Sequence, residues 1–300
     1  MGIPKRTVAE TTVGCPFGER LSNVAVLSTF YPMAELSVRP AQADDVQRIV
    51  ELTRARRSNL ARWAPVYFNP SEGADEGHAW FLEFIVAADN HDTYVLSADD
   101  TVCGFFVLIS QVAHTWIDDL CVSDQSQLPA VLEAIDDLAA RPWVTCVPTA
   151  DEVTAGAMRS HGLRSASSYW ARSVEPAAAP TELVSAHVDP DTANVPAHTF
   201  GAGPFMPDTP GAFVLVHGDG YVIGSPPATT PIFDPGGPTT VIDQLVGSDR
   251  FSLLEVSVDA AARRGDAQVV IVIDGNDDDL AEDATAAGFT RVVDLFAATT

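Results

Sequence analysis

Two consecutive carboxylates in an apolar, strand-like segment are the residues of this sequence best suited to do chemistry. The segment reads Ile117-Asp118-Asp119-Leu120, and a single carboxylate, Asp243, recurs in the similar segment Ile242-Asp243-Gln244-Leu245. A carboxylate whose pKa is raised by burial can accept a proton from an amine and act as a general base. The alternative is that these carboxylates cap or anchor neighbouring loops, and the residue types alone leave both readings open.

Other catalytic and metal-binding patterns are absent from the sequence. It contains no His-Glu-x-x-His segment, no Walker phosphate loop and no Gly-x-Ser-x-Gly elbow. The four cysteines, none in Cys-x-x-Cys spacing, are Cys15, Cys103, Cys121 and Cys146. Three of them lie in apolar, strand-like segments, which indicates buried reduced thiols rather than disulfides or zinc ligands. We therefore predict no metal site.

The charge of the chain restricts its partners. With 41 acidic and 17 basic residues the formal net charge is -24, which opposes binding to nucleic acid because phosphates are held mainly by Lys and Arg. The same charge could attract cationic amines, or it could simply keep the protein in solution. No apolar run approaches the roughly 20 residues of a membrane-spanning helix, and the N-terminal stretch lacks a secretion signal. We expect a cytoplasmic protein that binds neither nucleic acid nor membrane.

The chain repeats one order of segments. Residues 115–120 are echoed by residues 240–245, and residues 132–141 by residues 254–263. Residues 158–163 and 284–289 then close each copy with a glycine followed by an apolar residue. Similarity at this spacing predicts two related domains rather than a solenoid. We place an N-terminal arm at 1–35, a first domain at 36–175, a linker rich in Pro, Ala and Thr at 176–204, and a second domain at 205–300.

Hydrophobic periodicity assigns secondary structure to both copies. In the first domain it predicts a strand at 36–40, helices near 46–52 and 80–85, and a hairpin of strands at 94–97 and 102–109. A strand at 116–122, a helix at 128–140, a strand at 143–147 and a helix at 151–160 follow. The second copy repeats this order from a hairpin at 212–224, but it has no room for the two opening helices. The second domain is therefore predicted to be truncated at its N-terminal side.

This order of elements resembles the GNAT superfamily of acyl-CoA-dependent N-acyltransferases. The similarity rests on the segment Ile117-Asp118-x-Leu120-x-Val122, on the turns at Gly162-Leu163 and Gly288-Phe289, and on the element order occurring twice. It covers about residues 36–174 and 205–300. It implies an α/β (α+β) fold of two GNAT-like domains, each a mixed, mainly antiparallel sheet flanked by helices. It also implies direct transfer of an acetyl or other acyl group from acetyl-CoA or another acyl-CoA to a small primary amine.

The resemblance further implies a cofactor site in the first domain. In that family the strand edge matching Leu120, Cys121 and Val122 hydrogen-bonds the pantetheine arm, and the next loop presents backbone amides to the diphosphate. The matching loop positions are Gln125, Ser126, Gln127 and Leu128. The sequence departs from the family here, because this loop lacks the glycines that let a backbone close on a diphosphate. Both copies instead place a carboxylate there, Asp124 and Asp249.

The catalytic positions implied by the resemblance are incomplete. The family often has a proton-donating tyrosine four residues before the closing glycine, where this chain has Met158 and Ala284. The candidate bases are Asp118 or Asp119, with Asp243 in the second copy. An arginine-rich and aromatic stretch at 54–84 would border the acceptor site or form the solvated face of a helix pair. Two functions stay open: an N-acyltransferase, or a GNAT fold without catalysis that serves as a binding, regulatory or scaffolding protein.

Overall fold

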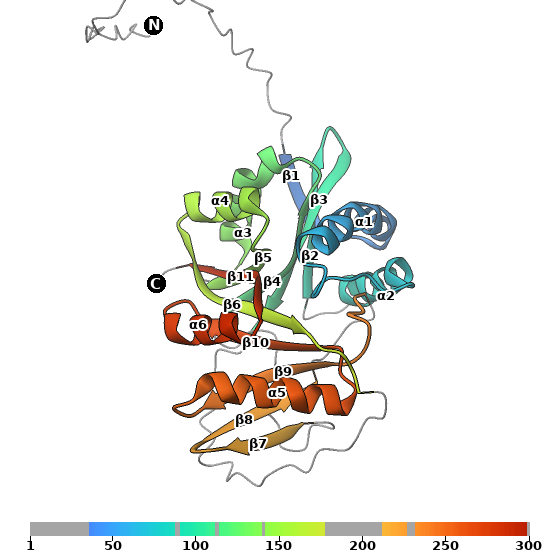
Figure 1. Ribbon diagram of the computed structural model, residues 1–300. Helices are drawn as coiled ribbons and strands as arrows, with labels where there is room; N and C mark the ends of the chain where they lie inside the picture. The colour runs from blue at the N-terminus through green and yellow to red at the C-terminus, as the bar shows by residue number, and fades with distance from the viewer. Residues whose placement is uncertain are drawn as a thin grey trace, which may run out of the picture. The chain divides into compact units, whose positions relative to one another are not determined.

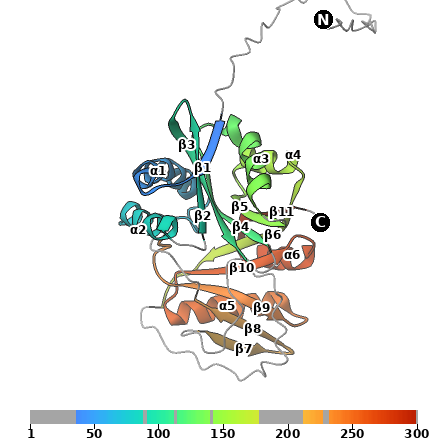
Figure 2. The same ribbon diagram turned by 180° about the vertical axis from the view of Figure 1, so that it is seen from behind.

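One mixed β-sheet runs through both halves of the chain (Figures 1 and 2). The computed structural model describes residues 36–87, 91–111, 114–139, 142–177, 212–226 and 232–298. The predicted arm at 1–35 and most of the predicted linker lie outside the described residues. The strand order is β1-β2-β3-β4-β5-β11-β6-β10-β9-β8-β7. The strands are β1 Leu36–Pro40, β2 His91–Ala98, β3 Thr101–Ser110, β4 Thr115–Val122, β5 Trp143–Pro148, β6 Leu163–Ser173, β7 Phe213–His217, β8 Gly220–Ser225, β9 Thr239–Val246, β10 Gln268–Asp274 and β11 Thr290–Ala298.

Helices cover the sheet of the first half on both faces. The α-helices are α1 Val46–Trp63, α2 Ala74–Ala87, α3 Leu128–Leu138, α4 Glu152–Ser160, α5 Arg250–Arg264 and α6 Asp278–Ala286. Helices α1 and α2 lie on one face of β1–β5, and α3 and α4 lie on the other (Figures 1 and 2). Helices α5 and α6 pack on one face of β8–β10. The mixed, mainly antiparallel α+β architecture expected from the sequence is thus confirmed, with the strands of both halves joined in one sheet.

Local sequence signals account for most turns and helix starts. Asp99 and Asp100 both have positive φ, 47° and 61°, as the tight turn between β2 and β3 requires. Helices α4, α5 and α6 each begin after an aspartate whose carboxylate accepts a backbone N–H of the first turn. Gly162 and Gly288, with φ of 89° and 77°, turn the chain from α4 into β6 and from α6 into β11.

Each half ends on a strand that pairs with the other half. Strand β6, the last of the first half, pairs antiparallel with β10, and β11, the last of the second half, pairs antiparallel with β5. Strands β6 and β11 also pair with each other at the centre of the sheet. The two halves therefore exchange their final strands, and each completes the sheet of the other.

The registers of these pairs follow a two-fold pseudosymmetry. When Gly162 and Gly288 are taken as equivalent positions, Ser168 of β6 is equivalent to Asp294 of β11, and these two residues lie opposite each other. The pairing of Trp170 with β10 is likewise equivalent to the pairing of Phe296 with β5. The pseudosymmetry axis therefore passes between β6 and β11.

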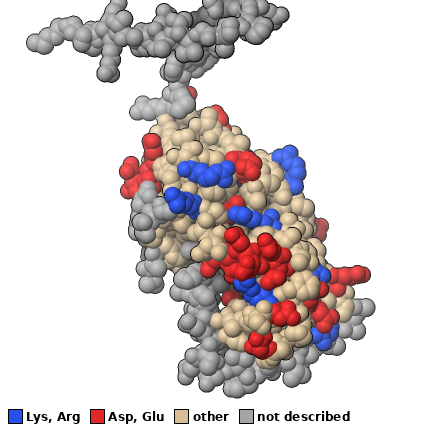
Figure 3. Space-filling model, turned by 60° about the vertical axis from the view of Figure 1, so that its left-hand side comes forward, with Lys and Arg blue, Asp and Glu red and all other residues tan. Residues whose placement is uncertain are grey.

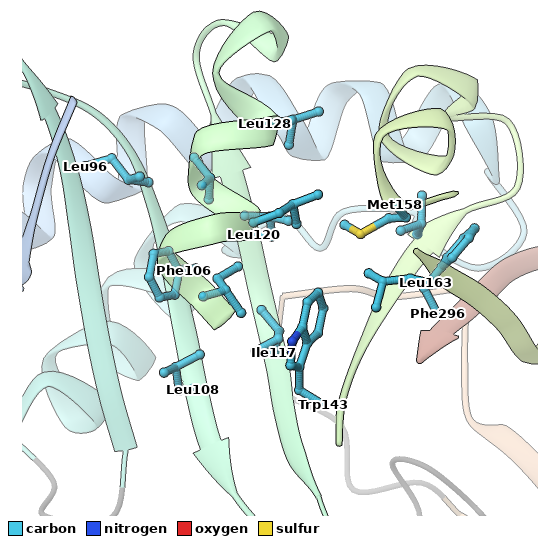
Figure 4. Packing of buried hydrophobic residues seen from close by; sticks show 14 of the residues in the cluster. Leu96, Phe106, Leu108, Ile117, Leu120, Leu128, Trp143, Met158, Leu163 and Phe296 are labelled. Atoms are coloured by element: carbon cyan, nitrogen blue, oxygen red, sulfur yellow. The ribbon is translucent and has the colours of Figure 1, made fainter. Parts of the chain in front are cut away.

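The exchange extends to side chains of the core. Phe296, which belongs to the second half, is buried in the first-half cluster beside Met158 and Leu163 (Figure 4). Its equivalent Trp170, from the first half, packs against the core under α5 and α6. Buried apolar surface dominates folding energetics, so neither core is complete without a strand from the other half.

The segment that follows α1 covers the second face of the exchanged strands. Val66, Tyr67 and Phe68 pack against a cluster formed by β6, β9, β10 and β11. The next residues pair with 232–234, where the amide of Ser71 donates to the carbonyl of Ile232 at 3.0 Å. The α1–α2 connection therefore covers apolar surface of the exchanged strands.

Candidate functional site

A bulge in β4 brings Asp118 and Asp119 to the same face of the sheet. The pairing of β3 with β4 shifts between Phe106 opposite Leu120 and Leu108 opposite Ile117, so two residues of β4 face one of β3. Side chains normally alternate between faces, and a bulge breaks that alternation. Ile117 and Leu120 both pack under α3 and α4, which leaves the two carboxylates between them on the α1–α2 face.

The bulge lies where β4 leaves its parallel neighbour. Strands β4 and β5 pair only from Thr115 opposite Trp143 to Ile117 opposite Thr145. The Thr145 hydroxyl donates to the carbonyl of Ile117 at 3.2 Å and closes this short ladder. Among the described residues, β4 has no ladder partner on the β5 side beyond Ile117. The carboxylates therefore lie at the point where the edge of β4 becomes available.

The two carboxylates are held in different electrostatic environments. Loss of solvation, together with the neighbouring charge of Asp119, raises the pKa of Asp118 to about 6. Asp118 nevertheless keeps solvent-exposed surface, and its carboxylate accepts the indole N–H of Trp116 at 3.2 Å. Burial is the largest single influence and would raise the pKa of Asp119, but the contact with His78 and two arginine charges together lower it. These charges are those of Arg56 and Arg57. Near neutral pH, Asp118 is thus the carboxylate suited to exchange a proton.

Buried residues of α1 and α2 support Asp119. His78 on α2 is 4% exposed and its Nε2 lies 3.4 Å from a carboxylate oxygen of Asp119. Arg57 on α1 is 5% exposed, and its guanidinium donates to Nδ1 of His78 at 2.8 Å. The same guanidinium donates to the Thr53 hydroxyl at 3.0 Å and pairs with Asp75. A continuous polar chain therefore runs from α1 through α2 to β4.

The thiols near the site are not nucleophiles. Burial raises the pKa of Cys121 to about 11, and burial with the nearby Asp118 charge raises the pKa of Cys146 still further. A thiol that stays protonated at neutral pH is a poor nucleophile. Burial also raises the pKa of Tyr67 and Tyr169, which lie close together with ring centroids 6.0 Å apart. Both phenols therefore keep their protons.

The strand edge expected to hold a pantetheine arm faces the gap between β4 and β5. The amide of Ser123 donates to the carbonyl of Cys103 at 2.7 Å, on the β3 side. Because backbone groups alternate along an antiparallel strand, those of Leu120 and Val122 point to the opposite side, toward β5. The Cys121 side chain packs under α1 and the Leu120 side chain under α3. The backbone of Leu120 and Val122, rather than their side chains, is what this site offers to a ligand.

In the loop after β4, the backbone amides of residues 126–128 donate to groups of the chain itself. The amide of Ser126 donates to the Asp124 carboxylate at 2.9 Å, and the amide of Gln127 to the Asp124 carbonyl at 3.0 Å. The amide of Leu128 bonds to the carbonyl of Gln125, and the next residue, Pro129, has no amide hydrogen. Asp124 thus bonds to the amides at which the family resemblance predicts a diphosphate.

The second half repeats this arrangement with its own differences. The Asp249 carboxylate accepts the amide of Ser252 at 3.0 Å and caps α5 in the same way. A register shift between β8 and β9 marks an equivalent bulge, but its carboxylate, Asp243, is only 7% exposed. The Ser225 hydroxyl donates to the Asp243 carboxylate at 2.5 Å, and burial raises the pKa of Asp243. Asp243 is thus enclosed, whereas Asp118 reaches solvent.

The expected position of a proton donor is apolar in both halves. Met158 and Ala284 are each 0% exposed and belong to the cores under α3–α4 and α5–α6. Figure 4 shows Met158 among the buried apolar side chains of this cluster, with its thioether directed toward the side of Leu120. The sequence reasoning missed His78 and Arg57, because their chemistry depends on two helices meeting the β4 bulge. A polar residue at an apolar-face position of each helix was the available signal.

Other kinds of site find no support in the part of the chain that the structure describes. No group of three or more His, Cys, Asp or Glu side chains within it is arranged to hold a metal ion. None of the described helices is long and apolar enough to cross a membrane. On the face drawn in Figure 3, Asp and Glu side chains form a larger continuous area than Lys and Arg. On that face an anionic ligand therefore meets a larger continuous area of negative than of positive charge.

Comparison with solved structures places this fold among acetyltransferases. A GCN5-related N-acetyltransferase from Sphaerobacter thermophilus matches 88% of this chain and 96% of its own, with a TM-score of 0.53 and 15% identity. A PaiA N-acetyltransferase from Thermoplasma acidophilum in complex with coenzyme A matches 43% of this chain and 90% of its own (TM-score 0.33, 16% identity). A spermidine N-acetyltransferase mutant from Vibrio cholerae matches 43% and 80% (TM-score 0.33, 11% identity). No protein-family model and no curated protein matches the chain.

The chain has the GNAT acetyltransferase fold. The Sphaerobacter match spans both halves, in keeping with a tandem arrangement of GNAT-like units. At such low identity the likeness defines the fold, and the function has to be argued from the site.

Proposed function

We propose that this protein is an acyl-CoA-dependent N-acyltransferase that acts on a small primary amine at the β4 bulge. The observation that carries the proposal is the carboxylate pair Asp118 and Asp119, placed on one face where β4 leaves β5. Two neighbouring acids whose pKa values move in opposite directions are the usual arrangement for acid–base work near neutral pH. The GNAT fold supports the reaction class.

The reaction follows from the groups present. The amine nitrogen attacks the thioester carbonyl carbon, a C–N bond forms, and the C–S bond breaks as the thiolate leaves. Asp118 accepts the proton lost by the amine, and Asp119 remains ionised beside it. Transfer is direct, because the thiols of Cys121 and Cys146 stay protonated. The leaving thiolate takes its proton from water, since Met158 has none to give.

The donor is held mainly through its pantetheine arm. The backbone of Leu120 and Val122 faces the gap and can pair with the amides of that arm as an added strand would. The nucleotide contributes little, because Asp124 already occupies the amides at the loop after β4. Acetyl-CoA and the shorter acetyl-pantetheine should therefore have similar KM values.

A thiol-release assay tests the proposal. Purified protein is given acetyl-CoA or acetyl-pantetheine with a panel of primary amines, and free thiol is measured over time. Asp118→Asn should lower kcat/KM by about 100- to 10,000-fold, as expected for loss of a general base. Asp137→Asn, an exposed carboxylate on α3, is the matched control and should change nothing. Turnover that Asp118→Asn leaves intact would remove the base from the mechanism.

A binding module without catalysis is the second candidate. It is favoured by the filled helix N-termini at Asp124 and Asp249 and by the buried apolar groups at Met158 and Ala284. Titration of acetyl-pantetheine or acetyl-CoA by calorimetry separates the two functions. Binding without turnover for any amine supports the module, and turnover supports the enzyme.

A further inference from the structure

His78 has an unusual position for a buried histidine. Its Nε2 has no well-aligned hydrogen-bond partner among the described residues, although Asp119 lies 3.4 Å away. Arg57 can only donate, so Nδ1 of His78 accepts and the ring N–H lies on Nε2. A buried N–H without a full partner costs free energy, which indicates that it serves a purpose at the carboxylate it faces.

We propose that His78, fixed in this tautomer by Arg57, is a positioning residue that holds Asp119 ionised and leaves Asp118 as the carboxylate that exchanges the proton. The inference rests on the proposed function and names the residues that divide the work within its carboxylate pair. His78 does not touch the reacting atoms in this scheme. It acts through Asp119, whose fixed charge sets the proton affinity of Asp118.

The groups around the pair are consistent with this division. Asp118 is faced by Asp119 and Trp116 on its own strand, by Cys146 of β5 and by His78 of α2. Asp119 is faced by His78 of α2 and by two arginines of α1, Arg56 and Arg57. His78 thus acts on both carboxylates. The two arginine charges act on Asp119, while Asp118 also meets a negative neighbour, a protonated thiol and one indole N–H.

The second half of the chain supplies an internal comparison. It lacks described equivalents of α1 and α2, the helices that carry Arg57 and His78. At its bulge the residue in the place of Asp119 is a neutral amide, Gln244, whereas the carboxylate in the place of Asp118 is kept as Asp243. Within the described residues, the second carboxylate of the bulge thus occurs in the half whose helices place a buried histidine and a buried arginine beside it.

Carboxyl-carbon NMR of aspartate-labelled protein tests the division without relying on activity. In the wild type we expect the titration near pH 6 on Asp118, with Asp119 ionised throughout that range. His78→Leu should move a substantial part of that step from Asp118 to Asp119. His78→Gln, which can still accept from Arg57 and donate to Asp119, should restore the wild-type pattern. Unchanged titrations in folded His78→Leu would overturn the proposal.

Two further variants keep the result unambiguous. His161→Leu removes another histidine that lies 2.9 Å from a carboxylate, Asp136, and should leave both titrations as they are. Asp119→Asn keeps His78 in place and should lower the Asp118 titration toward the ordinary aspartate value, because the like charge is gone. If Asp119→Asn leaves the Asp118 titration unchanged, Asp119 carries no charge and the proposal is wrong. This test holds even if His78→Leu fails to fold.

The thiol-release assay separates this inference from the proposed function. The acidic limb of kcat/KM should follow the Asp118 titration in the wild type and in His78→Gln, and should deviate from it in His78→Leu. If the titrations respond to His78→Leu but the protein shows no turnover, the proposed role of His78 is supported and the proposed acyltransferase function is contradicted. If the protein shows turnover but the titrations do not change in His78→Leu, the acyltransferase function is supported and the proposed role of His78 is contradicted.

Discussion

The exchanged strands predict that both halves unfold as one unit, and two equivalent leucines test this. Leu132 on α3 and Leu254 on α5 occupy matching places in the repeat, and each is 0% exposed in the core of its own half. A Leu→Ala change at such a site costs about 2–5 kcal/mol, from lost transfer energy and the cavity left behind. Each kcal/mol lowers Tm by about 2–4 °C in a protein of this size class, so either variant should lose about 4–20 °C.

The expected result is one transition that moves by a similar amount in both variants. Tryptophan fluorescence follows the transition as a whole, because Trp170 packs against the second-half core while the other four tryptophans lie in the first half. Hydrogen exchange of peptides from 213–298 reports on the second half alone. Because β11 completes the first core and β6 the second, Leu132→Ala should weaken exchange protection in β9 and β10 as much as in β4 and β5. Two transitions, or protection lost only in the mutated half, would refute the strand-exchange argument.

Three further predictions follow from individual contacts. Asp124→Ala should lower Tm through loss of the bond to Ser126, and it should tighten acetyl-CoA binding by freeing that amide. Asp249→Ala should lower Tm in the same way without improving binding, and thermal melts and calorimetry compare the two variants. The pKa of Asp118 is raised to about 6, from about 4 in an unfolded chain, so the folded state binds an extra proton between these values. The free energy of unfolding should therefore fall as pH rises from about 4 to 6. Asp118→Asn should remove that part of the pH dependence in urea titrations. Gly104→Ala should destabilise the protein by about 1–3 kcal/mol, because the added Cβ would lie 2.7 Å from the carbonyl oxygen of Cys121. Gly156→Ala on α4, where an added Cβ has nothing within 4 Å, should stabilise the protein by about 0.5–1 kcal/mol. An equal loss of stability in both variants would contradict the packing argument.

Local structure was largely readable from the sequence. The periodicity at 102–109 and 143–147 predicted β3 and β5 to within one or two residues, and the hairpin of β2 and β3 was expected from its two strands. Helix α1 runs much further than the predicted 46–52, to Trp63. Its later turns carry the buried polar residues Thr53 and Arg57, which interrupt the apolar pattern and hide the helix from a periodicity argument.

The candidate site was only half readable. Strand alternation would put Asp118 and Asp119 on opposite faces, and only the bulge brings them together. Asp124 was recognised as an obstacle to a diphosphate, but whether its side chain turned toward or away from the helix could not be read from composition. The capping bond to Ser126 decides this, because an aspartate before a helix satisfies backbone donors that otherwise lack partners.

The sequence by itself determined the repeat, the order of elements and the family of folds, because these depend on spacing and periodicity along the chain. Only the tertiary structure decided which half each final strand completes and which residues meet at the β4 bulge. Strand exchange leaves no local signature, since β6 and β11 have the same apolar pattern whichever partner they pair with. The contact of His78 with Asp119 likewise joins residues far apart in the chain, so its energetics exist only once the helices and the sheet have packed.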